Sequence, residues 1–174
     1  LVGSEMCIRD RSIIILAKNV AVNSNTIDAD SSEIAISILN ANFSSIENNS
    51  VEGGNLGIKV QNSTSAFIYN NTIKSNSGFG IQILINSELA RVKFNQLTDN
   101  EDNAIVISSS NSTEVYNNTI KENAGYGFAA TNSKLIDFRG NTIEDNDGGV
   151  KYTNCDFCNL TNNKIDENLS LIHI

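Results

Sequence analysis

The sequence predicts an all-β solenoid of about seven coils, each 22–24 residues long and each carrying three short strands. A phrase made of Asn, a small or polar residue and an aliphatic residue recurs at that period. It occurs as NTI (25–27), NSV (49–51), NTI (71–73), NQL (95–97), NTI (118–120), NTI (141–143) and NKI (163–165). A fixed period of this length indicates stacked repeats, in which residues one period apart are vertical neighbours.

Each predicted strand is supported by its own column of apolar residues. The first strand places an apolar residue three positions before the recurring Asn, namely Val22, Ile46, Ile68, Val92, Val115, Phe138 and Leu160. The second strand carries the aliphatic residue of the phrase itself. The third strand shows apolar residues at alternate positions, which are Ile34/Ile36, Ile58/Val60, Ile81/Ile83, Ile105/Ile107, Phe128/Ala130 and Val150/Tyr152. This alternation indicates strands with one buried face, and stacking lets the coils bury those faces together.

The corners between strands are predicted to be built from asparagine, which makes up 28 of the 174 residues. Asparagine tolerates the left-handed backbone conformation, and its amide groups can form hydrogen-bonded ladders from coil to coil. One predicted corner column is Asp30, Asn76, Asn100, Asn123, Asn146 and Asn168, interrupted by Gly54. A second is Asn40, Asn62, Asn86, Asn111, Asn132 and Asn154.

The composition narrows the classes of partner. A formal net charge of −8 argues against binding to nucleic acid or to anionic membranes, and no apolar run is long enough to cross a bilayer. The two ends, 1–11 and 169–174, share no pattern with the middle and resemble translations of the two strands of a DNA-sequencing adapter. We therefore assign the β-solenoid to 12–168 and expect it to be a truncated, uncapped piece that associates end to end through its open strand edges. This region contains no histidine.

The repeat NxTIxxNxxxGIxI at about 23 residues resembles the right-handed parallel β-helix repeats of the pectate-lyase-like superfamily. The resemblance covers 12–168 and implies a right-handed parallel β-helix in an extracellular or cell-envelope protein. The superfamily includes enzymes that act on sugars, surface adhesins and phage tailspikes. Its enzymes are implied to work in a groove walled by long loops, whereas the coils of this chain keep a nearly constant length.

No catalytic residues are predicted. The third strand is expected to present outward Ala35, Lys59, Gln82, Val106, Ala129 and Lys151, a set without carboxylates or aromatic rings. A glycoside hydrolase would need paired carboxylates there. The phrase GYGF (125–128) is similar to a motif of β-helix alginate epimerases, but Ala129, Ala130 and Thr131 follow where that motif continues with Asp, Pro and His.

The first strand carries the strongest candidate binding surface. Its outward residues form two expected columns, in which Tyr69, Lys93, Tyr116 and Arg139 lie beside Phe67, Arg91, Glu114 and Asp137. Aromatic rings stack on sugar faces, and Arg and Lys bind carboxylates, so we predict carbohydrate binding by Phe67, Tyr69, Arg91, Lys93, Tyr116 and Arg139. The alternative is that these pairs only stabilise an exposed sheet.

Two further clusters have a structural explanation and a functional one. The acidic column Asp99, Glu122, Asp145 and Glu167 could bind calcium, or it could be a solvated edge that keeps the protein soluble. No other cofactor is indicated. Cys155 and Cys158 are predicted to pack at the core, with Cys155 in a turn column otherwise held by Ser63, Ser87, Ser112 and Ser133, because a lone CxxC supports neither a zinc site nor a thioredoxin-like motif.

These observations favour a non-catalytic carbohydrate-binding or scaffold segment whose partner is a polysaccharide, with acidic polysaccharides among the candidates. Two alternatives remain. One is a fragment of a polysaccharide lyase, glycoside hydrolase or epimerase whose catalytic coils lie elsewhere. The other is a structural adhesin or stalk.

Overall fold

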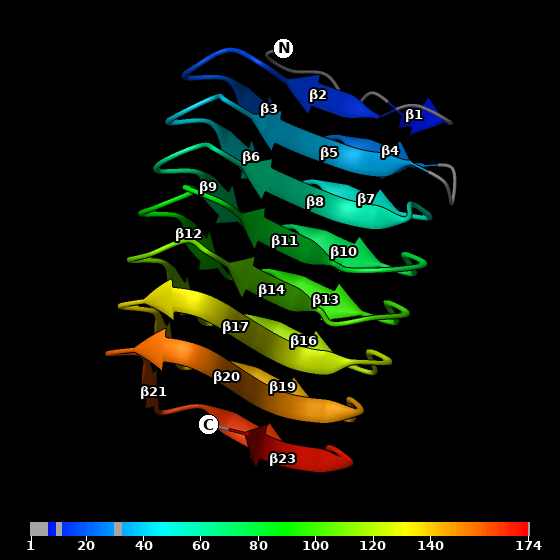
Figure 1. Ribbon diagram of the computed structural model, residues 1–174. Helices are drawn as coiled ribbons and strands as arrows, with labels where there is room; N and C mark the ends of the chain where they lie inside the picture. Colours follow the sequence, from blue (N-terminus) through cyan, green and yellow to red (C-terminus); the bar gives the residue numbers. More distant parts are fainter. Residues whose placement is uncertain (1–6, 10–11, 30–32, 174) are drawn as a thin grey trace.

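The computed structural model of the chain describes residues 7–9, 12–29 and 33–173. Its strands form three parallel sheets, and each coil adds one strand to each sheet in turn. The chain therefore forms a solenoid that runs from the N-terminal end to the C-terminal end of the stack (Figure 1). The predicted all-β parallel β-helix is therefore confirmed.

Sheet B provides the front face in Figure 1, while sheets C and A lie behind it. Sheet B contains β2 (Ile13–Ile15), β5 (Ile34–Leu39), β8 (Leu56–Gln61), β11 (Ile81–Leu84), β14 (Ile105–Ser108), β17 (Tyr126–Lys134), β20 (Gly148–Asp156) and β23 (Ser170–His173). Sheet C contains β3 (Ala21–Asn23), β6 (Ser45–Glu47), β9 (Phe67–Tyr69), β12 (Arg91–Lys93), β15 (Glu114–Tyr116), β18 (Asp137–Arg139) and β21 (Asn159–Thr161). Sheet A contains β1 (Cys7–Arg9), β4 (Thr26–Asp28), β7 (Ser50–Glu52), β10 (Thr72–Lys74), β13 (Gln96–Thr98), β16 (Thr119–Lys121), β19 (Thr142–Glu144) and β22 (Lys164–Asp166).

The register matches the sequence period in all three sheets. In sheet A, for example, Ile73 pairs with Leu97, which in turn lies one coil from Ile120. All three side chains are fully buried, as are the inward residues Ile68, Val92 and Val115 of sheet C. A shift of one residue would turn each of these columns to solvent, so burial fixes the register.

One prediction of register in sheet B is wrong. Ile36, not Ile34, pairs with Ile58, and Ala35 is fully buried rather than outward. Ser37 takes the outward position level with Lys59. The cause is the connection from Ile27 to Ile36, which is longer than the corresponding connection from Val51 to Ile58, so that counting at a fixed period gave the wrong pair.

The main internal support is a buried asparagine ladder formed by the Asn of the recurring phrase. Each side-chain amide donates to the Oδ1 of the next coil's Asn at 2.9–3.0 Å, along Asn25, Asn49, Asn71, Asn95, Asn118, Asn141 and Asn163. Each backbone N–H donates to the same Oδ1 at 2.8–3.0 Å. The sequence analysis used this residue only as a marker of the repeat and did not predict its ladder.

The predicted corner columns are confirmed in part. Asn76, Asn100, Asn123, Asn146 and Asn168 form a second ladder, with amide-to-Oδ1 distances of 2.7–2.9 Å, while Asp30 lies outside the described residues. In the other column the amides of Asn62 and Asn154 donate to Asn40 and Asn132. Asn111 was wrongly placed there, because Ser108 pairs with Thr131 and so brings Ser109 level with Asn132.

The turn column that contains Cys155 is a ladder of serines. Backbone N–H groups donate to the hydroxyls of Ser63, Ser87, Ser110 and Ser133, so Ser110 takes the place predicted for Ser112. Cys155 lies level with Ser133, and both Cys155 and Cys158 contact the core as predicted. They also form a disulfide, which the sequence analysis did not predict.

Both end segments that the sequence analysis set apart contribute strands. β1 pairs with β4, and β23 pairs with β20. Parallel pairing uses backbone groups alone, so the open edge of a stack accepts a strand whose sequence lacks the repeat.

Replacing Asn95 by Ala should destabilise the fold by about 3 kcal/mol or more, because it leaves buried partners such as the backbone N–H of Asn71 without an acceptor. Urea unfolding followed by circular dichroism measures the change. The control is Asn70→Gly, which removes one exposed amide bond at a left-handed position and should cost no more than about 0.5 kcal/mol. Equal losses in the two variants would contradict a dominant role for the buried ladder.

Candidate functional site

The outer face of sheet C brings the predicted binding residues together. Parallel pairing places Tyr69, Lys93, Tyr116 and Arg139 in one column and Phe67, Arg91, Glu114 and Asp137 in the next. The inward residues between them are buried, so each three-residue strand presents two side chains outward. We call this surface the sheet C face.

Lys93 lies at the centre of the aromatic residues of this face. Its Nζ is 4.7 Å from the ring centroid of Phe67, and 5.5 and 5.6 Å from those of Tyr69 and Tyr116. The rings of Phe67 and Tyr69 are nearly parallel, with an interplanar angle of 9° and centroids 5.6 Å apart. In the part of the chain that the structure describes, no carboxylate lies within 4.0 Å of the Lys93 ammonium.

The two arginines of the sheet C face are paired with acids. Arg91 Nε lies 3.5 Å from Glu114 Oε2, and Arg139 Nε lies 2.6 Å from Asp137 Oδ2. The Arg139 guanidinium also covers the Tyr116 ring, with its Cζ 4.3 Å from the ring centroid. The hydrogen bond that Arg139 donates to Asp137 raises the pKa of Arg139. Lys93 is therefore the cation of this face that is free to meet an anionic ligand.

Phe94 belongs to the same surface, and the sequence analysis missed it. It follows β12, is 46% exposed, and meets the rings of Tyr69 and Tyr116 edge-to-face at centroid distances of 5.7 and 6.3 Å. Its backbone is left-handed, with φ at 58°. The signal was present in the sequence as an aromatic residue at a corner position that other coils fill with Asn, Ser or Gly.

A shallow groove opens beside the rings at the start of β12. It has a volume of about 390 Å³ and is lined by Ser65, Ala66, Phe67, Leu89, Arg91 and Lys93. Leu89 is 56% exposed. The coil centred on β12 thus carries an apolar side chain at each corner and two cations between them, an arrangement that suits an amphipathic ligand with anionic groups.

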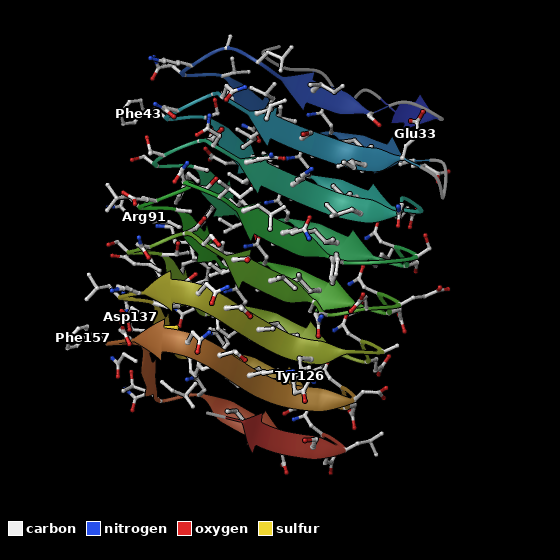
Figure 2. All side chains as sticks on the ribbon, viewed as in Figure 1. Glu33, Phe43, Arg91, Tyr126, Asp137 and Phe157 are labelled. Carbon is white, nitrogen blue, oxygen red and sulfur yellow. A yellow bond between two sulfur atoms is a disulfide. The ribbon has the colours of Figure 1, made fainter. Side chains whose placement is uncertain are left out.

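A second and larger groove lies on the outer face of sheet B, near the C-terminal end of the stack. Its volume is about 780 Å³, and its lining includes Asp102, Tyr126, Asp147 and Lys151. The Lys151 ammonium is 5.2 Å from the Tyr126 ring centroid, and Figure 2 shows Tyr126 on this front face. The prediction that this face has no aromatic or acidic residue was wrong because it considered only the strand centres, whereas Tyr126 begins β17 and the two aspartates lie in the turns before β14 and β20.

The acidic column lies at the corner that follows sheet A. Asp99, Glu122, Asp145 and Glu167 all have left-handed backbones, with φ between 54° and 58°. Within 12–29 and 33–170, no three His, Cys, Asp or Glu side chains are grouped as a metal site requires. Calcium binding by this column stays a prediction.

The family model described as right handed beta helix region matches residues 3–135 and 34–174. The chain belongs to the right-handed β-helix family. The right-handed β-helix inferred from the repeat is thereby confirmed. No curated protein sequence matches the chain.

Among solved structures, this β-helix is similar to the A-modules of two mannuronan C-5 epimerases from Azotobacter vinelandii. AlgE6 has a TM-score of 0.82 at 16% identity over 96% of this chain, and AlgE4 has 0.81 at 14% over 98%. The enzymatically active domain of tailspike protein 2 from bacteriophage CBA120 has 0.69 at 12% over 82% of this chain and 24% of that one. This chain spans 53% and 56% of the two epimerase modules, so it is about half as long. At these identities the likeness shows a shared fold.

The residues that the structure describes contain no helix long and apolar enough to span a membrane.

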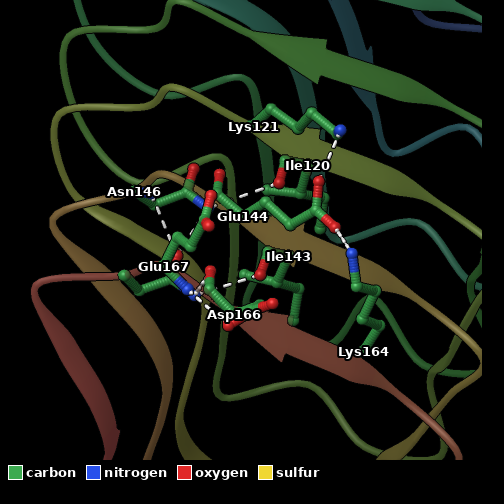
Figure 3. Close-up of polar contacts among 9 residues, drawn as sticks. Ile120, Lys121, Ile143, Glu144, Asn146, Lys164, Asp166 and Glu167 are labelled. Atoms are coloured by element: carbon green, nitrogen blue, oxygen red, sulfur yellow. Dashed lines mark hydrogen bonds and ion pairs between the residues drawn. The ribbon is translucent and has the colours of Figure 1, made fainter.

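The outer face of sheet A differs from the sheet C face, since each of its lysines Lys74, Lys121 and Lys164 forms an ion pair with a glutamate. Glu144 lies between Lys121 and Lys164 of the neighbouring coils and forms an ion pair with each (Figure 3). Lys74 pairs with Glu52 at 2.9 Å. Hydrogen bonds from Lys121 and then Lys164 lower the pKa of Glu144, and the same bonds raise the pKa of each lysine.

Stability should depend on pH through Glu144. Because its pKa is lower in the folded state, its stabilising effect is present above the ordinary value of 4.5 and is lost as the pH falls through the folded value. Glu144→Gln should therefore lower Tm at pH 7 and have little effect at about pH 2, where the carboxyl is protonated. Thermal unfolding of both proteins at the two pH values measures this, and an equal difference at both would contradict it.

Proposed function

We propose that this right-handed β-helix binds an acidic polysaccharide through the sheet C face. The observation that carries the proposal is the Lys93 ammonium, which lies among three aromatic rings and lacks a carboxylate partner within the described residues. Rings of this kind stack on the apolar faces of sugars, and an unpaired ammonium binds the carboxylate of a uronate sugar.

The comparisons support the same class of ligand without deciding it. The two A-modules are named as mannuronan epimerases, and the periplasmic protein AlgG, with a TM-score of 0.71 at 19% identity over 90% of this chain and 44% of that one, is named as an alginate epimerase. Alginate is an acidic polysaccharide. We propose that this chain, like the periplasmic and phage proteins it resembles, works in the cell envelope or outside the cell, as a binding or scaffold segment.

A second candidate function rests on the sheet B groove. Two carboxylates, a phenol and an ammonium line it, and these groups can serve as acids and bases in bond-breaking reactions of sugars. We propose as the alternative that the whole protein is a polysaccharide lyase, hydrolase or epimerase that uses this groove. Measuring polysaccharide binding and polysaccharide cleavage or epimerisation by Tyr126→Ala and by variants of the sheet C face separates the two candidates.

Removing both tyrosines of the sheet C face should weaken binding to acidic polysaccharide by at least about tenfold, because each ring loses its contact with a sugar. The measurement is affinity electrophoresis of Tyr69→Ala/Tyr116→Ala in gels that contain polygalacturonate or alginate. Phe43→Ala is the control, since Phe43 is an exposed ring at the opposite corner of its strand. If the double variant migrates as the wild type does, the sheet C face is structural only.

Lys93→Met keeps the apolar stem of the side chain and removes its charge. It should weaken binding to an acidic polysaccharide by about tenfold and leave binding to a neutral one unchanged, because the charge-assisted contact alone is lost. Lys59→Met on sheet B is the matched control. Equal losses for acidic and neutral polymers would rule out recognition of carboxylates by Lys93.

A further inference from the structure

Phe94 occupies a corner where the other coils use residues suited to a left-handed backbone. The equivalent positions, which directly precede the buried asparagine ladder, are Ser24, Asn48, Asn70, Asn117, Gly140 and Asn162, all with φ between 52° and 64°. An unbranched polar residue or glycine adopts this conformation readily, whereas an aromatic residue is disfavoured there. Asparagine would also extend the exposed amide contact that joins Asn70 to Asn48.

The conformation alone does not single out Phe94. At the opposite corner Phe43, Leu89, Leu135 and Phe157 also have left-handed backbones, and Figure 2 shows Phe43 and Phe157 projecting away from the stack at one edge. The Phe43 ring meets no other ring in the described part of the chain. Phe94 differs because its half-exposed ring lies against both tyrosines of the sheet C face.

The three rings come from three successive coils. Tyr69 ends β9, Phe94 follows β12 and Tyr116 ends β15, so the rings follow one another along the solenoid axis. Two coil steps separate the tyrosines by roughly 10 Å. This separation is close to the length of a disaccharide in an extended 1,4-linked chain, in which alternate sugars present the same face.

We infer that Phe94 is the central ring of a three-ring platform, Tyr69–Phe94–Tyr116, that binds a 1,4-linked uronate chain running parallel to the solenoid axis. The inference rests on the proposed function and adds a binding residue, a direction and a class of linkage to it. Lys93, which precedes Phe94, then lies beside the middle of the bound uronate chain, where its ammonium reaches a sugar carboxylate. The ligand contact explains why an aromatic residue stands at a position better suited to asparagine.

The test uses the full chain and mannuronate oligosaccharides of defined length, from disaccharide to hexasaccharide, with affinities measured by isothermal titration calorimetry. Phe94→Asn, which installs the residue of the neighbouring coils, should lower the affinity for the tetrasaccharide about tenfold. Phe94→Tyr keeps the ring and should restore binding. Tyr69→Ala and Tyr116→Ala should each weaken binding of the same tetrasaccharide, because a chain along the axis spans both.

Phe43→Asn is the matched control, since it makes the same change at a left-handed position outside the sheet C face. It should leave affinity unchanged, and circular dichroism should show all variants folded. If Phe94→Asn binds as the wild type does while the tyrosine variants do not, Phe94 is no part of the platform and the proposed function stands. If Phe94→Tyr fails to restore binding, or only one tyrosine matters, the axial platform is wrong. If neither tyrosine matters, the proposed function itself fails.

Discussion

The structure depends on the parallel, in-register stacking of coils about 4.8 Å apart. Every other feature follows from this spacing, because it makes each residue the vertical neighbour of one 22–24 residues away. Apolar columns such as Ile73, Leu97 and Ile120 close the interior. The corners would leave polar backbone groups buried without partners, and the asparagine and serine ladders satisfy many of them.

The same spacing brings the outward side chains of successive coils together into continuous surfaces. Outward residues of one sheet stand close enough to interact across coils, and the three outer faces use this differently. On sheet A the lysines are paired with glutamates, as where Glu144 lies between Lys121 and Lys164, so these cations are compensated within the face. On sheet C rings alternate with cations, and Lys93 contacts rings in place of an acid. A face whose charges are paired with one another binds an ionic ligand poorly, whereas a face with an unpaired ammonium can bind an anion.

The likeness to epimerase modules concerns the scaffold. At 14–19% identity, with half of each module matched, the shared property is the stack of coils. The sheet B groove and the sheet C face are two separate surfaces on that stack, and each follows from residues of this chain. The sheet C face is the better-defined candidate binding site, since its rings and its unpaired cation lie together within one coil of β12.

The sequence by itself determined the fold, because a strict period makes burial and pairing agree in every coil. It also determined the columns of the sheet C face, since outward positions of in-register strands are fixed by counting. Counting failed at Ala35, where a longer connection brings Ile36 level with Ile58. Ser112 and Asn111 are wrong for another reason, since each lies two positions beyond the residue, Ser110 or Ser109, that a 23-residue step makes level with Ser133 or Asn132. Only the tertiary structure decided that the repeated Asn is a buried ladder, that Cys155 bonds Cys158, and that Phe94 joins the two tyrosines. These depend on side-chain direction at corners, where left-handed backbone turns a residue toward or away from its neighbours, and no periodicity in the sequence encodes that direction.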